Sequence, residues 1–303
     1  MSENLSTPKV TFVGIGAIGL PMAARVAAAG FDLTAVDFSA AQRTAAQEHG
    51  LRAASSAASA NEADAVIVMV ATGDQLRSAA LGPEELGSET QESAGLIAAM
   101  RPGASLIVMS TVGPEAVQTL VEPARERGIR LVDAPVTGGV ARAAVGSLRL
   151  FVSADSESID ENRELLESMG TIVECGNEIG DGQAFKAVNQ LLCSVHIVAA
   201  AEALALAQRL GLDPAQVLEA VAEGAAGSFM LSDRGPRMLQ GPEAQVASAV
   251  RIFVKDTSLV SEIAGAHGFE APLLEAARAK YLEAADAGLA RRDDSQVIAT
   301  YQR

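Results

Sequence analysis

The sequence predicts an α/β domain built on a doubly wound parallel sheet, followed by an all-α domain that a long helix joins to it. Three observations support this prediction. Up to about residue 174, short apolar runs alternate with amphipathic segments of helical length, which is typical of a parallel sheet covered on both faces. A glycine-rich turn follows the first run. Beyond about residue 180 the strand signals stop, and alanine, leucine, glutamate and glutamine dominate.

Five strands are predicted in the first domain, which we place at residues 1–180, with the helical domain at 181–303. Each run is short, nearly continuous in apolar residues and rich in β-branched side chains, as in strands buried on both faces. The runs are VTFVG (10–14), LTAVD (33–37), AVIVMV (65–70), SLIVM (105–109) and RLVDA (130–134).

The second domain is predicted to open with one long helix. The segment from Asp181 to about Leu210 contains no proline, so at 1.5 Å per residue it can form a helix of roughly 45 Å. Its most apolar part includes Glu202 and falls short of the roughly 20 apolar residues of a membrane span, so we interpret it as a buried helix. Asp213 and Pro214 are typical of the start of the next helix.

Charge and composition restrict the partners. The 303 residues carry a formal net charge of -15, which argues against a broad surface for nucleic acid or an anionic membrane, because both require a basic face. We expect small molecules and copies of the same chain as partners. The polar start MSENLSTPK lacks the features of a signal peptide, so we expect a cytoplasmic protein. The charged run 291–294 is interpreted as a solvated turn.

Metal chemistry is not expected. Two cysteines, Cys175 and Cys193, have neither the number nor the spacing of a disulfide framework or a zinc site. The three histidines, His49, His196 and His267, form no cluster with metal-ligand spacing. We therefore expect another side chain to transfer protons.

Gly14, Gly16 and Gly19 form a dinucleotide-binding motif directly after the first predicted strand. In this motif the first glycine allows the tight turn, the second lets the backbone approach a pyrophosphate, and the third lets the helix pack on the strand. Pro21 falls in the first turn of the helix, where its missing N–H costs nothing. The first domain is therefore predicted to be of the Rossmann type and to bind a dinucleotide.

Asp37 indicates which dinucleotide. It stands at the end of the second predicted strand, where a carboxylate can accept hydrogen bonds from the adenosine ribose hydroxyls. A 2'-phosphate beside it would be repelled by up to about 4 kcal/mol at an effective dielectric near 20. This argument favours NAD over NADP. The alternative is that Asp37 only caps the following helix.

Three later stretches are also predicted to follow strand ends. Open α/β sheets bind ligands at the carboxyl edge of their strands, so these stretches are expected to converge with the glycine turn on one crevice. They are Ser110–Pro114, Asp133–Gly139 and Gly180–Gln190.

Four motifs along the chain together resemble those of the β-hydroxyacid dehydrogenase family, which includes 3-hydroxyisobutyrate dehydrogenases and tartronate semialdehyde reductases. The motifs are Gly14-x-Gly16-x-x-Gly19 with Pro21-Met22-Ala23, Asp133 to Gly139, Gly182-x-x-x-Lys186-x-x-Asn189, and Lys255-Asp256. The resemblance covers nearly the whole chain. Two departures are visible, since Thr137 stands where the family usually has serine and Arg25 where it usually has asparagine.

The resemblance implies an NAD-dependent dehydrogenase of small hydroxy acids in which Lys186 is the general acid and base. Burial and a cationic nicotinamide would both disfavour the charged form of this lysine and so bring its pKa toward that of a useful base. Asn189 and Gln190 would hold the substrate oxygens. The resemblance also implies cofactor contacts from Thr111 and Lys255.

The helical spacing supports a shared site. Lys186, Asn189, Gln190 and Cys193 fall at i, i+3, i+4 and i+7, so one helix face presents all four, and that face should meet the crevice. The alternative for Lys186 is an ordinary solvated helix lysine. His196 lies too far along the helix for the same site and is expected in the core or an interface.

The carboxylate of the substrate also has a predicted site. The backbone N–H groups of Thr137, Gly138 and Gly139 can bind it, because two glycines let the backbone come close. 6-Phosphogluconate dehydrogenases share the lysine but place a glutamate seven positions after it, where this chain has Cys193. We therefore expect oxidation without decarboxylation.

Within the family, several segments are most like L-threonate dehydrogenases, so a four-carbon sugar acid such as L-threonate is the expected substrate. 3-Hydroxyisobutyrate and tartronate semialdehyde (2-hydroxy-3-oxopropionate) are alternatives. A different class of hypothesis is a non-catalytic dinucleotide sensor, or an inactive subunit that binds NAD without turnover. The apolar surface of the segment from Asp181 to Leu210 predicts a homodimer or homotetramer.

Overall fold

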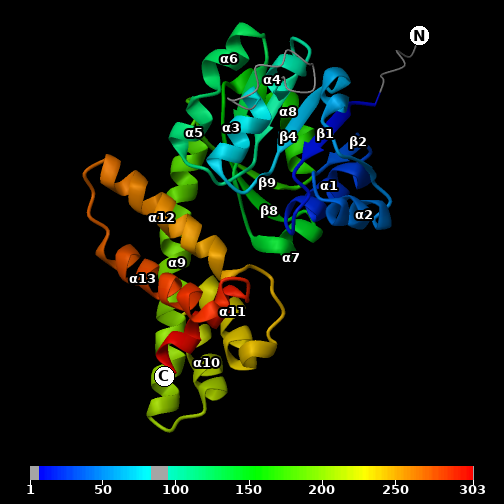
Figure 1. Ribbon diagram of the computed structural model, residues 1–303. Helices are drawn as coiled ribbons and strands as arrows, with labels where there is room; N and C mark the ends of the chain where they lie inside the picture. Colours follow the sequence, from blue (N-terminus) through cyan, green and yellow to red (C-terminus); the bar gives the residue numbers. More distant parts are fainter. Residues whose placement is uncertain (1–6, 83–94, 303) are drawn as a thin grey trace. The chain divides into compact units, whose positions relative to one another are not determined.

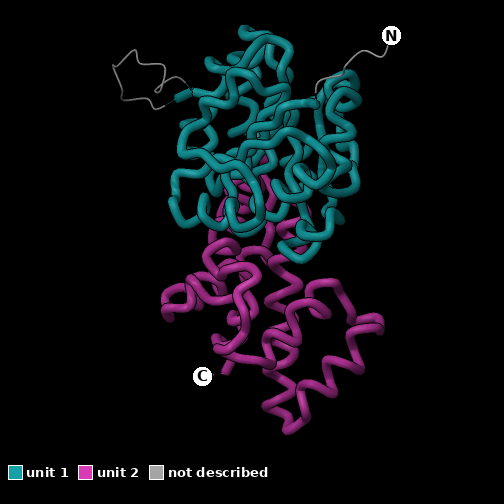
Figure 2. Tube along the Cα trace, turned by 90° about the vertical axis from the view of Figure 1, so that its right-hand side faces the viewer, with its two compact units in different colours: residues 1–186 teal, residues 187–303 magenta. Residues whose placement is uncertain are grey.

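The computed structural model describes residues 7–82 and 95–302, and Figure 1 shows the order of its elements. By the contacts within the chain it divides into two compact units, Met1–Lys186 and Ala187–Arg303 (Figure 2). The described part of the first unit holds a sheet of nine strands. These are β1 Lys9–Val13, β2 Asp32–Val36, β3 Arg52–Ala54, β4 Ala65–Val68, β5 Ser105–Val108, β6 Arg130–Asp133, β7 Val136–Thr137, β8 Leu148–Ser153 and β9 Gly170–Gly176.

Helices connect the strands of the first unit and make up the second. The first unit contains α1 Gly19–Ala28, α2 Ala40–Glu48, the 3-10 segment η1 Ala58–Glu62, α3 Gly73–Leu81, α4 Leu96–Ala99, α5 Pro114–Gln118, α6 Val121–Glu126, α7 Gly139–Ala144 and α8 Ser156–Glu167. The helix α9 Asp181–Arg209 begins in the first unit and continues into the second. It is followed by α10 Pro214–Ala222, α11 Phe229–Gln240, α12 Val250–Ala266 and α13 Pro272–Ala284, with the short segments η2 Gly241–Glu243, η3 Ala285–Leu289 and η4 Asp294–Tyr301.

The sheet has the strand order of a dinucleotide-binding fold. Its strands run β3-β2-β1-β4-β5-β6-β8-β7, and β9 pairs with β8. The first six of these are parallel neighbours, in the order that characterises the Rossmann fold. The five predicted strands are β1, β2, β4, β5 and β6, so the predicted fold class is confirmed. Strands β3, β7, β8 and β9 were not predicted, and β8 runs antiparallel to β6 and β7.

Two apolar layers hold the helices on the faces of this sheet. Successive side chains of a strand alternate between faces, so Phe12 of β1 packs in the layer under α1, α2, α7 and α8, whereas Val13 packs in the layer under α3 to α6. Complete burial of one such side chain stabilises the fold by roughly 1.5–3 kcal/mol. Because β1 to β6 are parallel, the loops that follow them lie at one edge of the sheet, as the predicted crevice requires.

The second unit has a core of its own. Helix α9 contributes Ile197, Ala201 and Leu204 to an apolar cluster with side chains of α10 to α13 and η4. At its centre Phe253 stacks on the completely buried Tyr281, with ring centroids 5.1 Å apart. The helices of the second unit therefore pack around one hydrophobic core, as predicted for an all-α domain.

By length and composition, α9 is a helix that could cross a membrane. It has 29 residues, but 50% of its most apolar stretch is buried inside the protein. The core helix of a water-soluble protein passes the same test. The burial of α9 agrees with the interpretation of this segment as a buried core helix.

Candidate active site

The glycine turn after β1 is tightly packed at two of its glycines and open at the third. A Cβ on Gly14, whose φ is 91°, would lie 2.3 Å from the carbonyl oxygen of Met69, and one on Gly19 would lie 2.1 Å from the carbonyl oxygen of Gly14. These two positions therefore require glycine for packing. Above Gly16, by contrast, no atom lies within 4 Å of the Cβ position. The turn thus combines tight packing with an open backbone surface, which fits the approach of a pyrophosphate.

Asp37 lies beside this turn at the end of β2. Its Oδ2 accepts a hydrogen bond from the N–H of Ile15 (3.1 Å), and its Oδ1 accepts one from the N–H of Ser39 (2.8 Å). The side chain of Ser39, not that of Asp37, caps α2 by accepting from Gln42 N. The alternative that Asp37 only caps the helix is therefore wrong, and its half-buried carboxylate keeps lone pairs for a further donor.

A buried carboxylate stands at the end of β6. Asp133 is completely buried, and its Oδ2 accepts hydrogen bonds from the backbone N–H of Gln183 (3.0 Å) and the hydroxyl of Ser153 (3.3 Å). Its Oδ1 accepts from Nε2 of Gln183 (2.8 Å). Burial raises the pKa of Asp133 to about 6, although the hydrogen bonds from Gln183 and Ser153 favour the ionised form. The carboxylate therefore joins the first turn of α9 to the sheet.

The amide of Gln183 uses every hydrogen-bonding position it has. Besides Asp133, its Nε2 donates to the carbonyl oxygen of Ser110 (3.0 Å). Its Oε1 accepts from the backbone N–H groups of Val112 and Gly113, both at 3.0 Å. Two donors and two acceptor positions are thus filled. One side chain connects α9 with the loop after β5 and with the end of β6.

The raised pKa of Asp133 predicts a pH dependence of stability. Its pKa is about 6 in the folded protein against 3.8 unperturbed, so between these values the folded state binds more protons than the unfolded state. This stabilisation is complete below pH 3.8 and is lost as the pH rises through 6, by roughly 3 kcal/mol in total. Urea unfolding from pH 4 to 7 should therefore show wild-type stability falling relative to that of Asp133→Asn. Parallel curves for the two proteins would contradict the assignment.

Lys186 lies in the second turn of α9 and is 6% exposed. It shares the buried face of this helix with Gly182, Gln183, Ala187 and Gln190. An ordinary helix lysine extends its ammonium into water, so the alternative of a solvated lysine is wrong.

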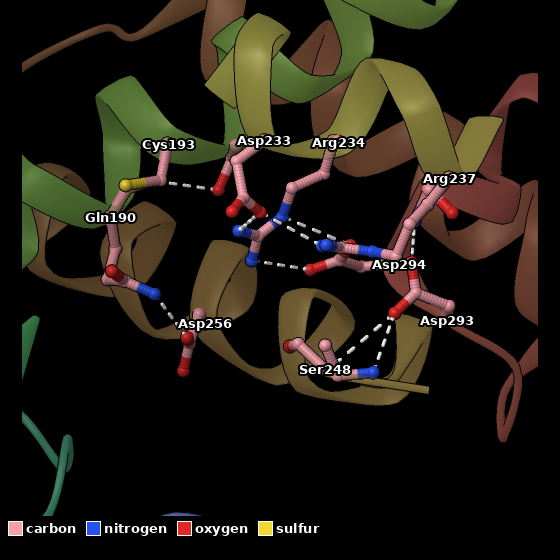
Figure 3. Close-up of polar contacts among 12 residues, drawn as sticks. Gln190, Cys193, Asp233, Arg234, Arg237, Ser248, Asp256, Asp293 and Asp294 are labelled. Carbon is pink, nitrogen blue, oxygen red and sulfur yellow. Dashed lines mark hydrogen bonds and ion pairs between the residues drawn. The ribbon is translucent and has the colours of Figure 1, made fainter. Parts of the chain in front are cut away.

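The polar residues one turn further on contact one another. Nδ2 of Asn189 donates to Oε1 of Gln190 (2.9 Å) and to the thiol of Cys193 (3.4 Å). Nε2 of Gln190 donates to the carboxylate of Asp256 on α12 (Figure 3). Lys255 pairs with the same carboxylate at 2.8 Å. The structure thus brings four sequence-predicted residues of the second unit into one polar cluster, in which Gln190 contacts both Asn189 and Asp256.

Thr137 ends β7, Gly138 follows it, and Gly139 begins α7. Gly138 has a φ of 133° and Gly139 a φ of 74°, so both adopt backbone conformations that favour glycine. All three residues are half-buried. Thr111, in the loop after β5, is half-buried as well. These backbone groups lie at the ends of β5 and β7, two strands of the same sheet.

A buried ion-pair network in the second unit corrects one sequence-based expectation. Residues 291–294 were expected to form a solvated turn, but the carboxylates of Asp293 and Asp294 are 0% exposed. Nε of Arg234 donates to Oδ1 of Asp294 (3.3 Å) and Nη2 to Oδ2 (3.0 Å), while Nε of Arg237 donates to Oδ1 of Asp293 (3.0 Å). Figure 3 shows both guanidinium groups reaching from α11 toward these carboxylates. A run of charges in sequence cannot reveal partners sixty residues away.

Other features of the described residues lie outside this site. A hollow of about 500 Å³ opens at the amino edge of the sheet, opposite the loops that carry the predicted residues. The charged side chains that line this hollow pair with one another, as Lys9–Glu62 and Arg52–Asp32. Within residues 7–82 and 95–302, no group of three or more histidine, cysteine or acidic side chains is arranged to hold a metal ion.

The chain matches two protein-family models that together span almost its whole length. Residues 9–180 match the NAD-binding domain of 6-phosphogluconate dehydrogenase, and residues 180–301 match the NAD-binding domain of NADP-dependent 3-hydroxyisobutyrate dehydrogenase. The chain belongs to the β-hydroxyacid dehydrogenase family. The resemblance inferred from the four motifs is confirmed, and both models describe NAD-binding domains, so this β-hydroxyacid dehydrogenase has NAD as its cofactor.

Characterised members of the family align over nearly the full chain. An L-threonate dehydrogenase of Cupriavidus necator is 35% identical over 301 residues, covering 98% of this chain and 96% of that protein. An NAD-dependent L-serine dehydrogenase of Pseudomonas aeruginosa is 31% identical over 95% of this chain and 96% of its own length. The predicted class, an NAD-dependent hydroxyacid oxidoreductase, is therefore confirmed.

Solved structures agree with this assignment. A 3-hydroxyisobutyrate dehydrogenase from Salmonella typhimurium superposes with a TM-score of 0.86 at 30% identity, covering 97% of this chain and 99% of that one. The Mycobacterium tuberculosis 3-hydroxyisobutyrate dehydrogenase with L-serine gives a TM-score of 0.81 at 28% identity, covering 98% and 100%. Both superpositions therefore extend over nearly the whole of this chain and of the solved chain.

Proposed function

We propose that this β-hydroxyacid dehydrogenase oxidises the C2 hydroxyl of a small polyhydroxy acid of the L-threonate type, with Lys186 as general acid and base. The observation that carries the proposal is the burial of Lys186, 6% exposed, on a helix whose first turn is bonded to the carboxyl edge of the NAD-binding sheet. Several L-threonate dehydrogenases at 30–35% identity support the substrate class. NAD supplies the hydride acceptor.

Oxidation of an alcohol requires the hydroxyl proton to leave as the hydride departs from carbon. We propose that Nζ of Lys186 accepts this proton and returns it in the reverse direction. The amides of Asn189 and Gln190, held by Asp256 and Cys193, are proposed to orient the substrate oxygens. Side chains that are already held in place reduce the entropic cost of orienting the substrate for hydride transfer.

The substrate carboxylate and the cofactor are proposed to use backbone groups of the first unit. The N–H groups of Thr137, Gly138 and Gly139 are proposed to hold the carboxylate, since both glycines have positive φ and expose their backbone. The cofactor contacts are proposed to come from the glycine turn at Gly14, Gly16 and Gly19, from Asp37, and from Thr111 and Lys255. In domain terms, residues 1–180 would bind NAD and 181–303 would bind the substrate and mediate oligomerisation.

A panel of hydroxy acids tests this function. NADH formation is measured with L-threonate, L-serine, 3-hydroxyisobutyrate and glycerate, the alcohol whose oxidation gives tartronate semialdehyde. The proposal expects the highest kcat/KM with L-threonate. L-Serine and 3-hydroxyisobutyrate are the second candidates, because relatives that act on them also align over almost the whole chain. NAD binding without turnover of any acid would instead support a non-catalytic sensor or an inactive subunit.

Cofactor preference should depend on Asp37. We expect kcat/KM for NAD to exceed that for NADP by more than tenfold, because a 2'-phosphate would face this carboxylate. Asp37→Asn should narrow the ratio at least tenfold, while Asp32→Asn, at the other end of β2, should leave it unchanged. Steady-state kinetics with both cofactors measure the ratio. Equal or better efficiency of the wild type with NADP would refute the preference.

The reaction is proposed to end at oxidation. Seven positions after Lys186 stands Cys193, a thiol that is buried and accepts a hydrogen bond from Asn189. A thiol with a pKa near 8.5 is a poor acid for protonating the product of a decarboxylation. Carbon dioxide release coupled to NADH formation would contradict this part of the proposal.

Self-association and location complete the proposal. Phe185, Val188 and Leu192 lie at i, i+3 and i+7 of α9, and each is about half exposed or more. An apolar stripe of this kind is stabilised by a second copy, so we propose a homodimer or homotetramer in the cytoplasm. Light scattering at micromolar concentration should report at least twice the chain mass. A monomer there would count against it.

A further inference from the structure

The first turn of α9 is fixed to the sheet by more than ordinary packing. A Cβ on Gly182 would lie 2.4 Å from the carbonyl oxygen of Phe151 and 2.9 Å from Oδ2 of Asp133. The N–H of Gly182 donates to the hydroxyl of Ser153 (2.9 Å), which in turn donates to Asp133. Glycine at this position lets the helix approach the ends of β6 and β8 closely. Lys186 follows Gly182 by four residues and so lies one turn above this contact.

The same turn is connected to the loop that carries Thr111. The amide of Gln183 bonds the residues on both sides of Thr111, Ser110 through its carbonyl oxygen and Val112 through its N–H. The hydroxyl of Ser110 also accepts a hydrogen bond from the N–H of Val70 (2.8 Å), which ties this loop to the end of β4. Asp133 and Gln183 therefore link three strand ends to the helix of Lys186.

The polarity of these hydrogen bonds admits one orientation of the amide. Oε1 of Gln183 faces two backbone N–H groups, and Nε2 faces a carboxylate and a carbonyl oxygen. Rotating the amide by 180° would place donors against donors and acceptors against acceptors. In a buried site each mismatched group loses its hydrogen bond without gaining water. The amide thus specifies one position of α9 against the loop.

We propose that Asp133 and Gln183 are positioning residues of the dehydrogenase, which set the place of Lys186 relative to the loop of Thr111. This inference rests on the proposed role of Lys186 in proton transfer. Neither residue touches the substrate in this proposal. They act through the first turn of α9, whose displacement by about 1 Å would reduce turnover on the order of 100-fold.

The proposal is tested by a double-mutant cycle of Gln183→Glu, Asp133→Asn and the double variant that exchanges the amide and the carboxylate. Gln183→Glu places an acceptor against the acceptor atoms of Asp133 and Ser110, and Asp133→Asn removes the carboxylate that Nε2 needs. Each single variant should lower kcat by about 10- to 100-fold with the KM for NAD changed less than threefold. The double variant restores a donor and an acceptor between the two positions and keeps the net charge, so its kcat should exceed that of Gln183→Glu at least tenfold.

A matched control separates positioning from stability. Asn162 is a buried amide on α8 that donates to Ser105 and to the carbonyl oxygen of Ser158, at the amino end of β5 and away from the site. Asn162→Asp should lower the melting temperature as much as Gln183→Glu does, with kcat unchanged. If Asn162→Asp lowers kcat as much as the Asp133 and Gln183 variants do at an equal loss of melting temperature, the positioning role is wrong.

The outcomes also distinguish this proposal from the proposed function. All variants are assayed with L-threonate, L-serine and 3-hydroxyisobutyrate, and the best wild-type substrate is used throughout. The positioning role alone would be overturned if the wild type turns over and both single variants keep its kcat. It would also be overturned if the kcat losses of the two single variants multiply in the double variant. Absence of wild-type turnover on all three acids would overturn both.

Discussion

Replacing Lys186 by methionine should abolish most of the turnover while NAD binding and folding remain. A general acid and base contributes about 10²- to 10⁴-fold to the rate, so kcat with the best acid of the panel should fall by that factor. Lys186→Arg should be equally slow, because a guanidinium keeps the charge but cannot give up its proton near neutral pH. Stopped-flow or steady-state NADH formation measures kcat, and fluorescence titration with NADH measures cofactor binding.

Two comparisons sharpen this test. Lys9→Met removes a lysine at the opposite edge of the same sheet, where it pairs with Glu62, and should leave kcat unchanged. Added methylamine should partly restore turnover to Lys186→Ala, because a small amine can occupy the vacated space and accept the proton. Retention of more than a tenth of wild-type kcat by Lys186→Met would exclude this residue as the general base.

The largest loss of stability is expected from Asp294→Ala. The carboxylate is completely buried and paired in a two-pronged geometry with Arg234, whose side chain is 12% exposed. Removing it leaves the largely buried Arg234 paired only with Asp233, and breaking a buried ion pair in this way destabilises a protein by about 3–5 kcal/mol. The melting temperature should fall on the order of 10 °C. Thermal unfolding followed by circular dichroism measures this shift.

Burial, not ion pairing as such, is the reason for this expectation. The pair Arg125–Glu122 lies on α6 with side chains 75% and 64% exposed, and exposed pairs contribute little because water and salt screen them. Glu122→Ala should therefore leave the melting temperature nearly unchanged. Equal shifts for Glu122→Ala and Asp294→Ala would show that the buried network does not hold α11 to η4.

The parts of the fold that the sequence predicts are those with a local signature. The parallel strands β1, β2, β4, β5 and β6 are buried on both faces, so their apolar runs stand out. Strand β8, LRLFVS, has the exposed Arg149 within it and a half-buried Phe151, and β7 has two residues. Strands this short or this mixed depend on pairing with distant segments, which no local pattern records.

The residues of the candidate site likewise differ in whether a local sequence pattern reveals them. Gly14, Gly16 and Gly19 are recognised because their spacing follows from the turn itself, and Lys186 because of its motif. Asp133 and Gln183 were not predicted as site residues, since their significance lies in a hydrogen bond across fifty positions. The one available signal was an acidic residue closing a buried strand, where an ionised group is expected only with a partner.

Helix α9 carries Lys186 and, three and four residues later, Asn189 and Gln190 on one uninterrupted backbone. The separation of Lys186 from the two amides is therefore set by the helical rise, roughly 6 Å along the axis for four residues. An inserted residue between them would rotate one group by about 100° against the other. The spacing of these three side chains is accordingly intolerant of length changes.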